Sequence, residues 1–137
     1  MQPGTPFELH GIEILPIEVN HCVPAVGLIV RDSAGSIVMS GDTGPTDEIW
    51  RQATRRGDLR AVVLEVSFPD TMQAQATASG HLTPSGLAAE LTKLRGMTPR
   101  ILAVHLKPAY RPQIVDQLRA LGLPRLEVLV PGKTYEF

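Results

Sequence analysis

Three histidines and one aspartate lie where apolar segments give way to loops. They are His21 in EVNHC, Asp42 in SGDTG, His81 in SGHLT and His105 in AVHLKP. Imidazole and carboxylate side chains bind zinc or manganese, and they move protons near neutral pH. Because α/β sheets build their active sites at strand ends, these four residues are candidates for one shared site.

Glu65 is a fifth candidate because it interrupts the apolar run VVLEV. A buried carboxylate is destabilising unless it is paired, and His81 is a candidate partner. Each residue also has a simpler role: Asp42 could cap a helix or form a turn, and a histidine at a strand end is commonly solvated. A single site at one end of the sheet explains all five residues with one assumption.

The elements that must position these residues follow from the pattern of apolar residues. Strands are expected at residues 8–20, 25–31, 36–40, 61–66 and 100–106, and helices at 45–57, 83–96 and 110–121. Residues 67–82 are polar and small, which indicates a loop with one helical turn, and residues 125–137 indicate two short strands around a Pro-Gly turn. The alternation of strands and helices in the second half predicts an α/β sheet covered by helices.

Length and charge restrict the class of protein. A chain of 137 residues with 43% hydrophobic residues is expected to form one domain over residues 1–137. Its 13 basic and 14 acidic residues give a net charge of −1, which leaves no electrostatic footprint for nucleic acid. Aromatic residues are only 4%, which argues against stacking platforms for single strands.

Cysteine content and hydropathy indicate where the protein resides. Cys22 is the single cysteine, so an internal disulfide is excluded and an intracellular protein is favoured. No apolar run reaches the roughly 18 residues of a membrane span, and the first residues lack the layout of a signal peptide. We therefore expect a cytoplasmic protein that does not enter a membrane.

Five segments in this order resemble the second half of a metallo-β-lactamase-fold phosphodiesterase. They are VNHCVPAVGLIV, SIVMSGDTG, VVLEVSF, SGHLT and ILAVHLKP. The set is similar to class II 3′,5′-cyclic-nucleotide phosphodiesterases and, more distantly, to the tRNase Z group, whose inserted basic arm for tRNA has no counterpart here. The resemblance covers nearly the whole chain. It implies half of an αββα sandwich, with a mixed sheet and three helices.

The resemblance also implies a role for each candidate residue. His21 is similar to the third histidine of a first metal, Asp42 to the aspartate that bridges two metals, and His105 to the late histidine of the second metal. His81 with Glu65 resembles the pair that delivers a proton to the leaving oxygen. The implied cofactors are two divalent metals, zinc or alternatively manganese, which activate water and neutralise phosphoryl charge. The implied substrate is a small phosphodiester, a cyclic nucleotide.

One part of the family pattern is missing from the chain. These families carry an early HxHxDH motif that supplies four ligands, whereas the only earlier histidine here is His10 in ELHGI. Two protein ligands per metal are too few for a stable zinc site, so we expect partial or no occupancy and little activity in this chain alone. The first half of the sandwich is missing too. We therefore expect an open sheet face that an N-terminal half or a second copy would cover.

Three alternatives remain open at this point. A thioesterase or lactonase could use the same scaffold and metals. A non-catalytic interaction domain could keep the half-fold and pair through its open face. Finally, Met1 need not be the natural start, in which case the early motif would lie upstream. The preferred hypothesis is a metal-dependent phosphodiesterase whose site is completed by another segment.

Overall fold

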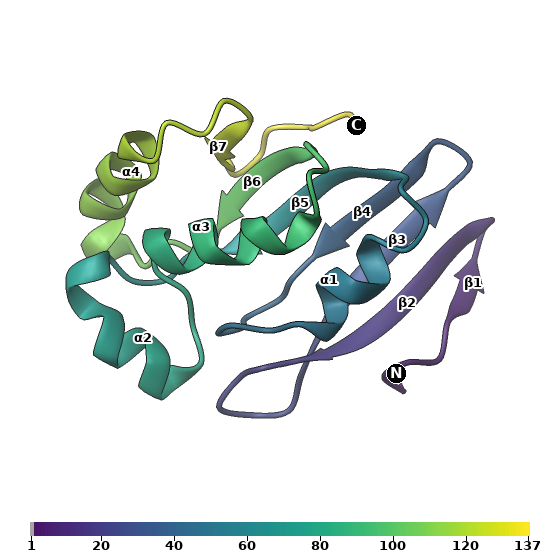
Figure 1. Cartoon of the computed structure of the whole chain (residues 1–137), viewed down its shortest axis with the longest axis horizontal. Coiled ribbons are helices and arrows are strands. Elements are labelled where there is room, and N and C mark those ends of the chain that lie inside the picture. The colour runs from purple at the N-terminus through teal and green to yellow at the C-terminus, as the bar shows by residue number, and fades with distance from the viewer. Residues whose placement is uncertain (1) are drawn as a thin grey trace.

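A seven-stranded mixed sheet forms the centre of the computed structural model, which describes residues 2–137 (Figure 1). The strands lie side by side in sequence order: β1 (Phe7–Leu9), β2 (Ile12–Val19), β3 (Ala25–Asp32), β4 (Gly35–Met39), β5 (Leu59–Glu65), β6 (Arg100–Val104) and β7 (Leu126–Val128). Strands β1 to β4 pair antiparallel, and β4 to β7 pair parallel. The α/β class and the mixed sheet are therefore confirmed.

Four α-helices and three short 3₁₀ segments connect the later strands. They are α1 (Glu48–Ala53), η1 (Asp70–Met72), α2 (Gln73–Ser79), α3 (Pro84–Leu91), η2 (Thr92–Leu94), η3 (Pro108–Tyr110) and α4 (Arg111–Ala120). The three predicted helices correspond to α1, α3 and α4. None of the helices described is long and apolar enough to cross a membrane.

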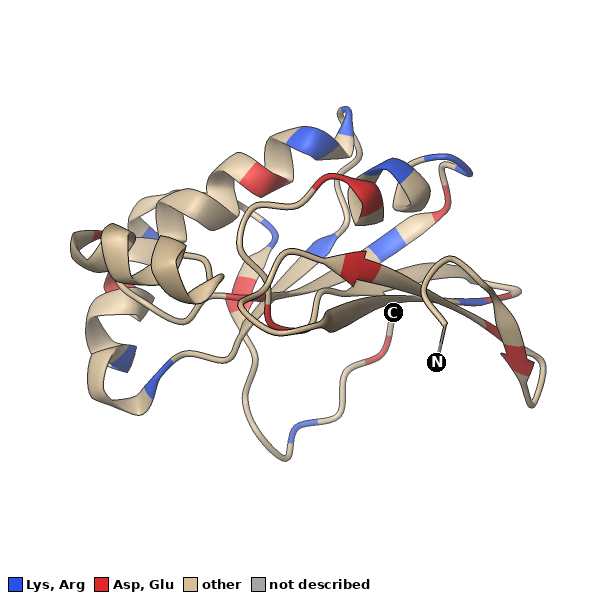
Figure 2. Cartoon of the chain, turned by 90° about the horizontal axis from the view of Figure 1, so that it is seen from below, with Lys and Arg blue, Asp and Glu red and all other residues tan. Residues whose placement is uncertain are grey.

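The core lies between the sheet and the helices. The apolar run of β5 places Val62 and Leu64 under the helices with no exposed surface, as expected for a central parallel strand. Helices α1 and α3 lie over the same face of the sheet, seen edge-on in Figure 2. Ile114 and Leu118 of α4 are buried in the same core. This packing holds the ends of β4, β5 and β6 in place.

The start of α3 is defined by local sequence. Thr83 is extended, with φ of −109°, and its side chain accepts a hydrogen bond from the backbone N–H of Gly86. Pro84 follows at the first helical position, where its missing N–H has no partner to lose. This cap fixes the turn that directly precedes α3, and that turn carries His81.

The opposite face of the sheet is partly open. Phe7, Leu9, Ile12 and Met39 lie on it with 39–53% of their surface exposed. The segment after β7 runs on this side of the sheet in Figure 2. Exposed apolar residues side by side on one face are typical of a surface that another segment or protein covers.

Three local predictions were wrong. The segment 8–20 is not one strand, because His10 and Gly11 both have positive φ and form a two-residue hairpin turn between β1 and β2. The segment 67–82 is not mainly loop, because η1 and α2 occupy much of it. After β7 no second strand forms within the described residues. Arg100 lies instead over the rings of Tyr135 and Phe137, which ties down that segment.

Candidate metal centre

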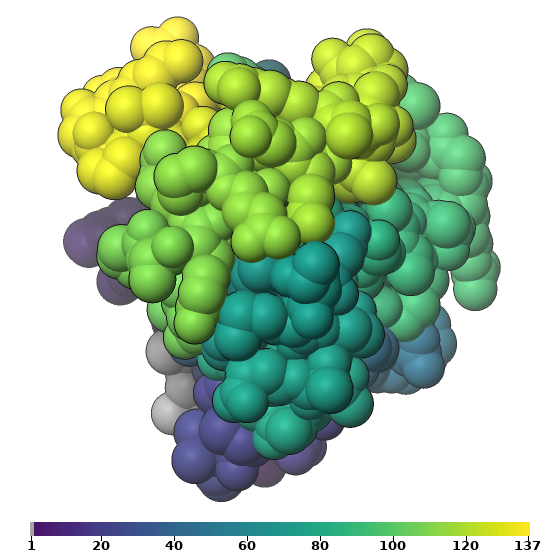
Figure 3. All heavy atoms as spheres, turned by 90° about the vertical axis from the view of Figure 1, so that its left-hand side faces the viewer, coloured from purple at the N-terminus to yellow at the C-terminus, as the bar shows by residue number. Residues whose placement is uncertain are grey.

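The five residues singled out in the sequence meet at one end of the sheet. His21 follows β2, Asp42 follows β4, Glu65 ends β5, His105 follows β6, and His81 lies between α2 and α3. Strands β2, β4, β5 and β6 run in the same direction, so their ends share one edge. Figure 3 shows this end of the molecule, where the segment around α2 (teal) lies between the β2–β3 loop (blue-purple) and the segment that carries α4 (green).

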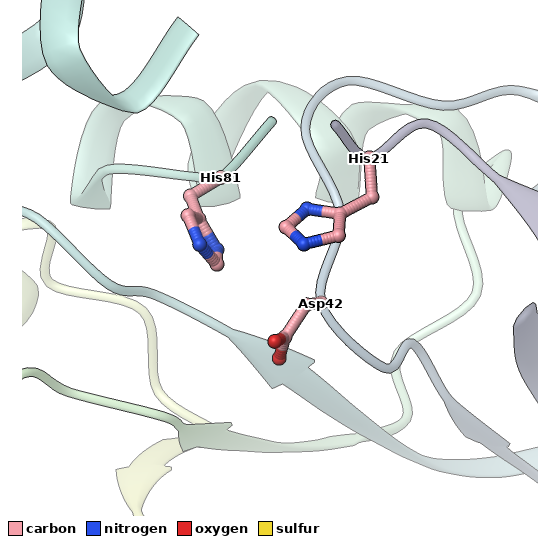
Figure 4. A group of neighbouring side chains, drawn as sticks. All are labelled: His21, Asp42 and His81. Atoms are coloured by element: carbon pink, nitrogen blue, oxygen red, sulfur yellow. The ribbon is translucent and has the colours of Figure 1, made fainter. Parts of the chain in front are cut away.

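Three side chains form the tightest group. His21, Asp42 and His81 each offer one ligand atom, and these atoms all lie within 4.8 Å of one another. Their side chains converge on a common space in Figure 4. The rings of His21 and His81 meet edge to face with centroids 4.9 Å apart. Within residues 2–137, no other group of three histidine, cysteine or acidic side chains meets this condition.

Both imidazoles of this group are held by their Nδ1 atoms. Nδ1 of His21 lies 2.9 Å from the carbonyl oxygen of Gly80, and Nδ1 of His81 lies 2.8 Å from Oε1 of Glu65. These acceptors place the ring proton on Nδ1 and leave the lone pair on Nε2. Metal-binding histidines are commonly oriented in this way. Nε2 of His21 also has the exposed thiol of Cys22 at 3.7 Å.

Glu65 is a buried acceptor that holds several parts of the site together. Its side chain is 1% exposed, and it accepts hydrogen bonds from the backbone N–H groups of Thr43 and Leu82 and from the hydroxyl of Ser67. Burial raises the pKa of Glu65 to about 7, against the opposing effect of these hydrogen bonds. Because Thr43 adjoins the predicted bridging aspartate, one carboxyl group positions both that loop and His81.

The environment favours a neutral imidazole at His81. Burial lowers the pKa of His81, and the positive charge of Lys107 acts in the same direction. A neutral ring keeps the Nε2 lone pair available for a metal. A protonated ring would be a strong acid towards a bound substrate.

His105 lies at the rim of the site. It has a positive φ of 62°, which is uncommon for a residue with a side chain. Its Nε2 is 3.6 Å from Oδ1 of Asp42, and its ring stacks on His81 with centroids 5.6 Å apart. Its side chain remains 44% exposed. The role of His105 as a ligand stays a prediction.

These residues fit a divalent metal ion. Two imidazole nitrogens with free lone pairs face a carboxylate oxygen, and His105 offers a further nitrogen nearby. Nitrogen and carboxylate oxygen are the donors that zinc accepts. The division of His21, Asp42 and His105 between two metals also stays a prediction.

Several residues that shape the site were not singled out from the sequence. Gly80 has a φ of 66°, and an added Cβ would lie 2.8 Å from Cα of His21. Ser67 contacts both Glu65 and Nδ1 of His81, at 3.0 and 3.2 Å. Lys107 places its ammonium 4.9 Å from the ring centre of Phe68. The sequence could have indicated these residues only by their position, because each lies within three positions of a candidate residue.

Comparison with known proteins identifies the family and the fold of the chain. The family model of the beta-lactamase superfamily domain matches residues 1–106. A probable 3′,5′-cyclic-nucleotide phosphodiesterase of Yersinia pestis is 27% identical over 123 residues, which cover 76% of this chain and 35% of that protein. In fold, the chain matches unliganded yeast PDE1 with a TM-score of 0.77 and 21% identity, covering 95% of this chain and 47% of that one.

A second solved structure is similar over a shorter part. The short form of human tRNase Z matches with a TM-score of 0.64 and 18% identity, covering 75% of this chain and 39% of that one. The chain spans about a third of the Yersinia protein and about half of the yeast chain. The mixed sheet and the family match agree with the resemblance noted in the sequence. The chain belongs to the metallo-β-lactamase superfamily.

Proposed function

We propose that this chain forms the C-terminal part of a metal-dependent phosphodiesterase that hydrolyses a small phosphodiester, with a 3′,5′-cyclic nucleotide as the preferred substrate. The observation that carries the proposal is the buried Glu65–His81 pair beside the cluster of His21 and Asp42. The name of the Yersinia relative supports the choice of substrate.

The residues of this chain have distinct tasks in the proposed reaction. His21, Asp42 and His105 would hold divalent metal ions, which polarise a phosphoryl group and lower the pKa of bound water. In its protonated form His81 would donate the Nε2 proton to the leaving ribose oxygen and return to the neutral ring, and Glu65 would stabilise the charged ring through Nδ1.

The charge beside His81 suits an anionic substrate. The ammonium group of Lys107 lies over the ring of Phe68, and that ring is 5.8 Å from the ring of His81. The charge of Lys107 acts on His81, and a positive charge beside the site favours a phosphodiester over the neutral ester of a lactone or thioester. This is the specific argument against a thioesterase or lactonase.

An activity assay tests the proposal. The chain should be assayed alone and within the longest protein that its gene encodes, with zinc or manganese, against a cyclic nucleotide, a thioester and a lactone. We expect phosphodiester hydrolysis only where the early ligands are present, and a loss of about 10²–10⁴-fold in kcat for His81→Ala. Preferred cleavage of the thioester or lactone, or unchanged phosphodiester turnover in His81→Ala, would contradict it.

A second candidate function follows from the open sheet face. Exposed Phe7, Leu9, Ile12 and Met39 suit a non-catalytic domain that pairs with a second copy through this face. Light scattering on the metal-free chain tests this alternative. A dimer that Met39→Lys dissociates, together with no metal uptake, would favour it over the enzyme.

A further inference from the structure

We infer that this chain, on its own, binds one divalent metal ion through Nε2 of His21, a carboxylate oxygen of Asp42 and Nε2 of His81. These are the three side chains whose ligand atoms lie within 4.8 Å of one another (Figure 4). The set differs from the one that the family resemblance implies, in which His105 is a ligand and His81 is not. The inference does not rest on the proposed phosphodiesterase reaction.

The orientation of His81 carries the inference. His81 is 7% exposed, and its Nδ1 lies 2.8 Å from Oε1 of the buried Glu65. This contact points Nε2 away from Glu65, towards His21 and Asp42. A ring held by a carboxylate at one nitrogen and free at the other is the arrangement that metal-binding histidines use.

The side chain of His105 is less well oriented for binding a metal than that of His81. Its side chain is 44% exposed, and within the described residues its ring nitrogens have no hydrogen-bonded partner. Its 3.6 Å approach to Asp42 is too long for a hydrogen bond, so no polar contact fixes the ring. Binding through His105 therefore loses more side-chain freedom than binding through His81.

Metal binding would require the ligand atoms of His21, Asp42 and His81 to move closer together than they are here. Zinc ligands at about 2.0–2.1 Å from the metal lie roughly 3.4 Å from one another in a tetrahedral site, less than the 4.8 Å span found here. Asp42 can supply the movement because its side chain is 42% exposed, whereas the two imidazoles are anchored. Three protein ligands and one open position form a set that zinc sites use.

The metal-binding role and the proton-donor role of His81 exclude each other at any one time, because both use Nε2. The three-ligand site is therefore assigned to the chain without the early motif. It resolves the shortage of two ligands per metal that the sequence indicates, since His81 supplies the third ligand of a single site.

Metal titration of the purified chain tests the inference. Zinc binding should be measured by calorimetry and by competition with a chromophoric chelator, and cobalt absorption should report the coordination. We expect one equivalent of zinc. His81→Asn should weaken binding by more than the roughly 10–100-fold that loss of a hydrogen-bonded partner of a ligand causes, and the matched His10→Asn, in the exposed turn between β1 and β2, should leave it unchanged.

Two further measurements keep the test decisive if His81→Asn disturbs folding. Asp42→Asn alters a half-exposed side chain and should also abolish tight binding with an unchanged circular dichroism spectrum. In the wild-type chain, nitrogen NMR should show zinc shifting Nε2 of His21 and His81 but not the ring of His105. No zinc binding, two equivalents of zinc, or a loss caused by His105→Asn but not by His81→Asn would overturn the inference. Failure of phosphodiester hydrolysis would leave these results unaffected.

Discussion

Two buried glutamates, Glu65 and Glu90, have opposite surroundings. Their side chains are 1% and 2% exposed. Glu90 of α3 accepts from Nζ of Lys93 at 2.8 Å and from Nε1 of Trp50 at 2.6 Å. Glu65 of β5 has no lysine or arginine partner among the described residues. Its titratable partner is the imidazole of His81, which is charged only when protonated.

The difference separates a structural carboxylate from a functional one. Lys93 keeps its charge at neutral pH and also bonds the carbonyl oxygen of Thr46, so the Glu90 region ties α3 to the segment before α1. The Glu65 region lacks such a permanent charge, and burial raises the pKa of Glu65 to about 7. A site whose charge is not fixed can exchange protons or respond to a metal. Exchanging one group at a time in each region tests this contrast.

The largest expected effect is on stability at the Glu90 region. Glu90→Ala removes the acceptor of Trp50 and the partner of Lys93, and it should lower the free energy of unfolding by about 2–3 kcal/mol. Urea unfolding followed by circular dichroism measures this loss. Zinc affinity of the folded fraction should not change. A folded Glu90→Ala chain that no longer binds zinc would show that the Glu90 region and the metal site are energetically coupled.

The Glu65 region should respond in the opposite way. Glu65→Gln keeps the shape and an acceptor for His81 but removes the negative charge, so zinc affinity should fall about 10–100-fold. The free energy of unfolding should change less than in Glu90→Ala. Glu90→Gln is the matched control, with unchanged zinc affinity. Equal zinc affinities in the two variants would remove the distinction between the regions.

The Glu65 part of this contrast was accessible from the sequence, because it depends on where a side chain lies along a strand. The interrupted run VVLEV indicated a buried Glu65 and suggested His81 as its partner, and both are present. The apolar segments 61–66 and 100–106 predicted β5 and β6. Helix α2 was missed because only Ala76 of its residues is buried, so it has no apolar stripe to detect.

The distances between side chains within the site could not be predicted from the sequence. Whether His81 or His105 lies nearer to His21 depends on backbone turns, which strand patterns do not encode. The left-handed conformation of Gly80 brings its carbonyl to His21, and the positive φ of His105 turns that residue towards the rim. Glu90 was missed as well, because a glutamate at helical spacing is ordinarily a solvated surface residue.

The pH dependence of stability should isolate Glu65. Its pKa is raised from 4.5 to about 7, so between these values the folded metal-free chain holds a proton that the unfolded chain has lost. The Glu65 contribution to the free energy of unfolding therefore falls as pH rises through this window, by an amount on the order of 1 kcal/mol. The lowered pKa of His81 acts in the opposite direction at the acidic end.

The difference between wild type and Glu65→Gln separates these two contributions. Urea unfolding with a chelator present, from pH 4.5 to 7.5, should show the downward slope in wild type and a smaller one in Glu65→Gln. Identical slopes would mean that Glu65 is not the group that titrates.

The smallest effect is expected from a single hydroxyl beside Glu65. Ser67 donates to Oε2 of Glu65 at 3.0 Å, and this bond lowers the pKa of the carboxyl against the larger effect of burial. Ser67→Ala should lower the free energy of unfolding at pH 8 by about 0.5–1 kcal/mol and raise the pKa of Glu65 further. Carboxyl-carbon NMR measures that pKa. Ser79→Ala, which removes a hydroxyl on α2, should leave it unchanged. A lowered pKa in Ser67→Ala would mean that the hydroxyl donates to Nδ1 of His81 instead, which would reverse the assigned proton positions.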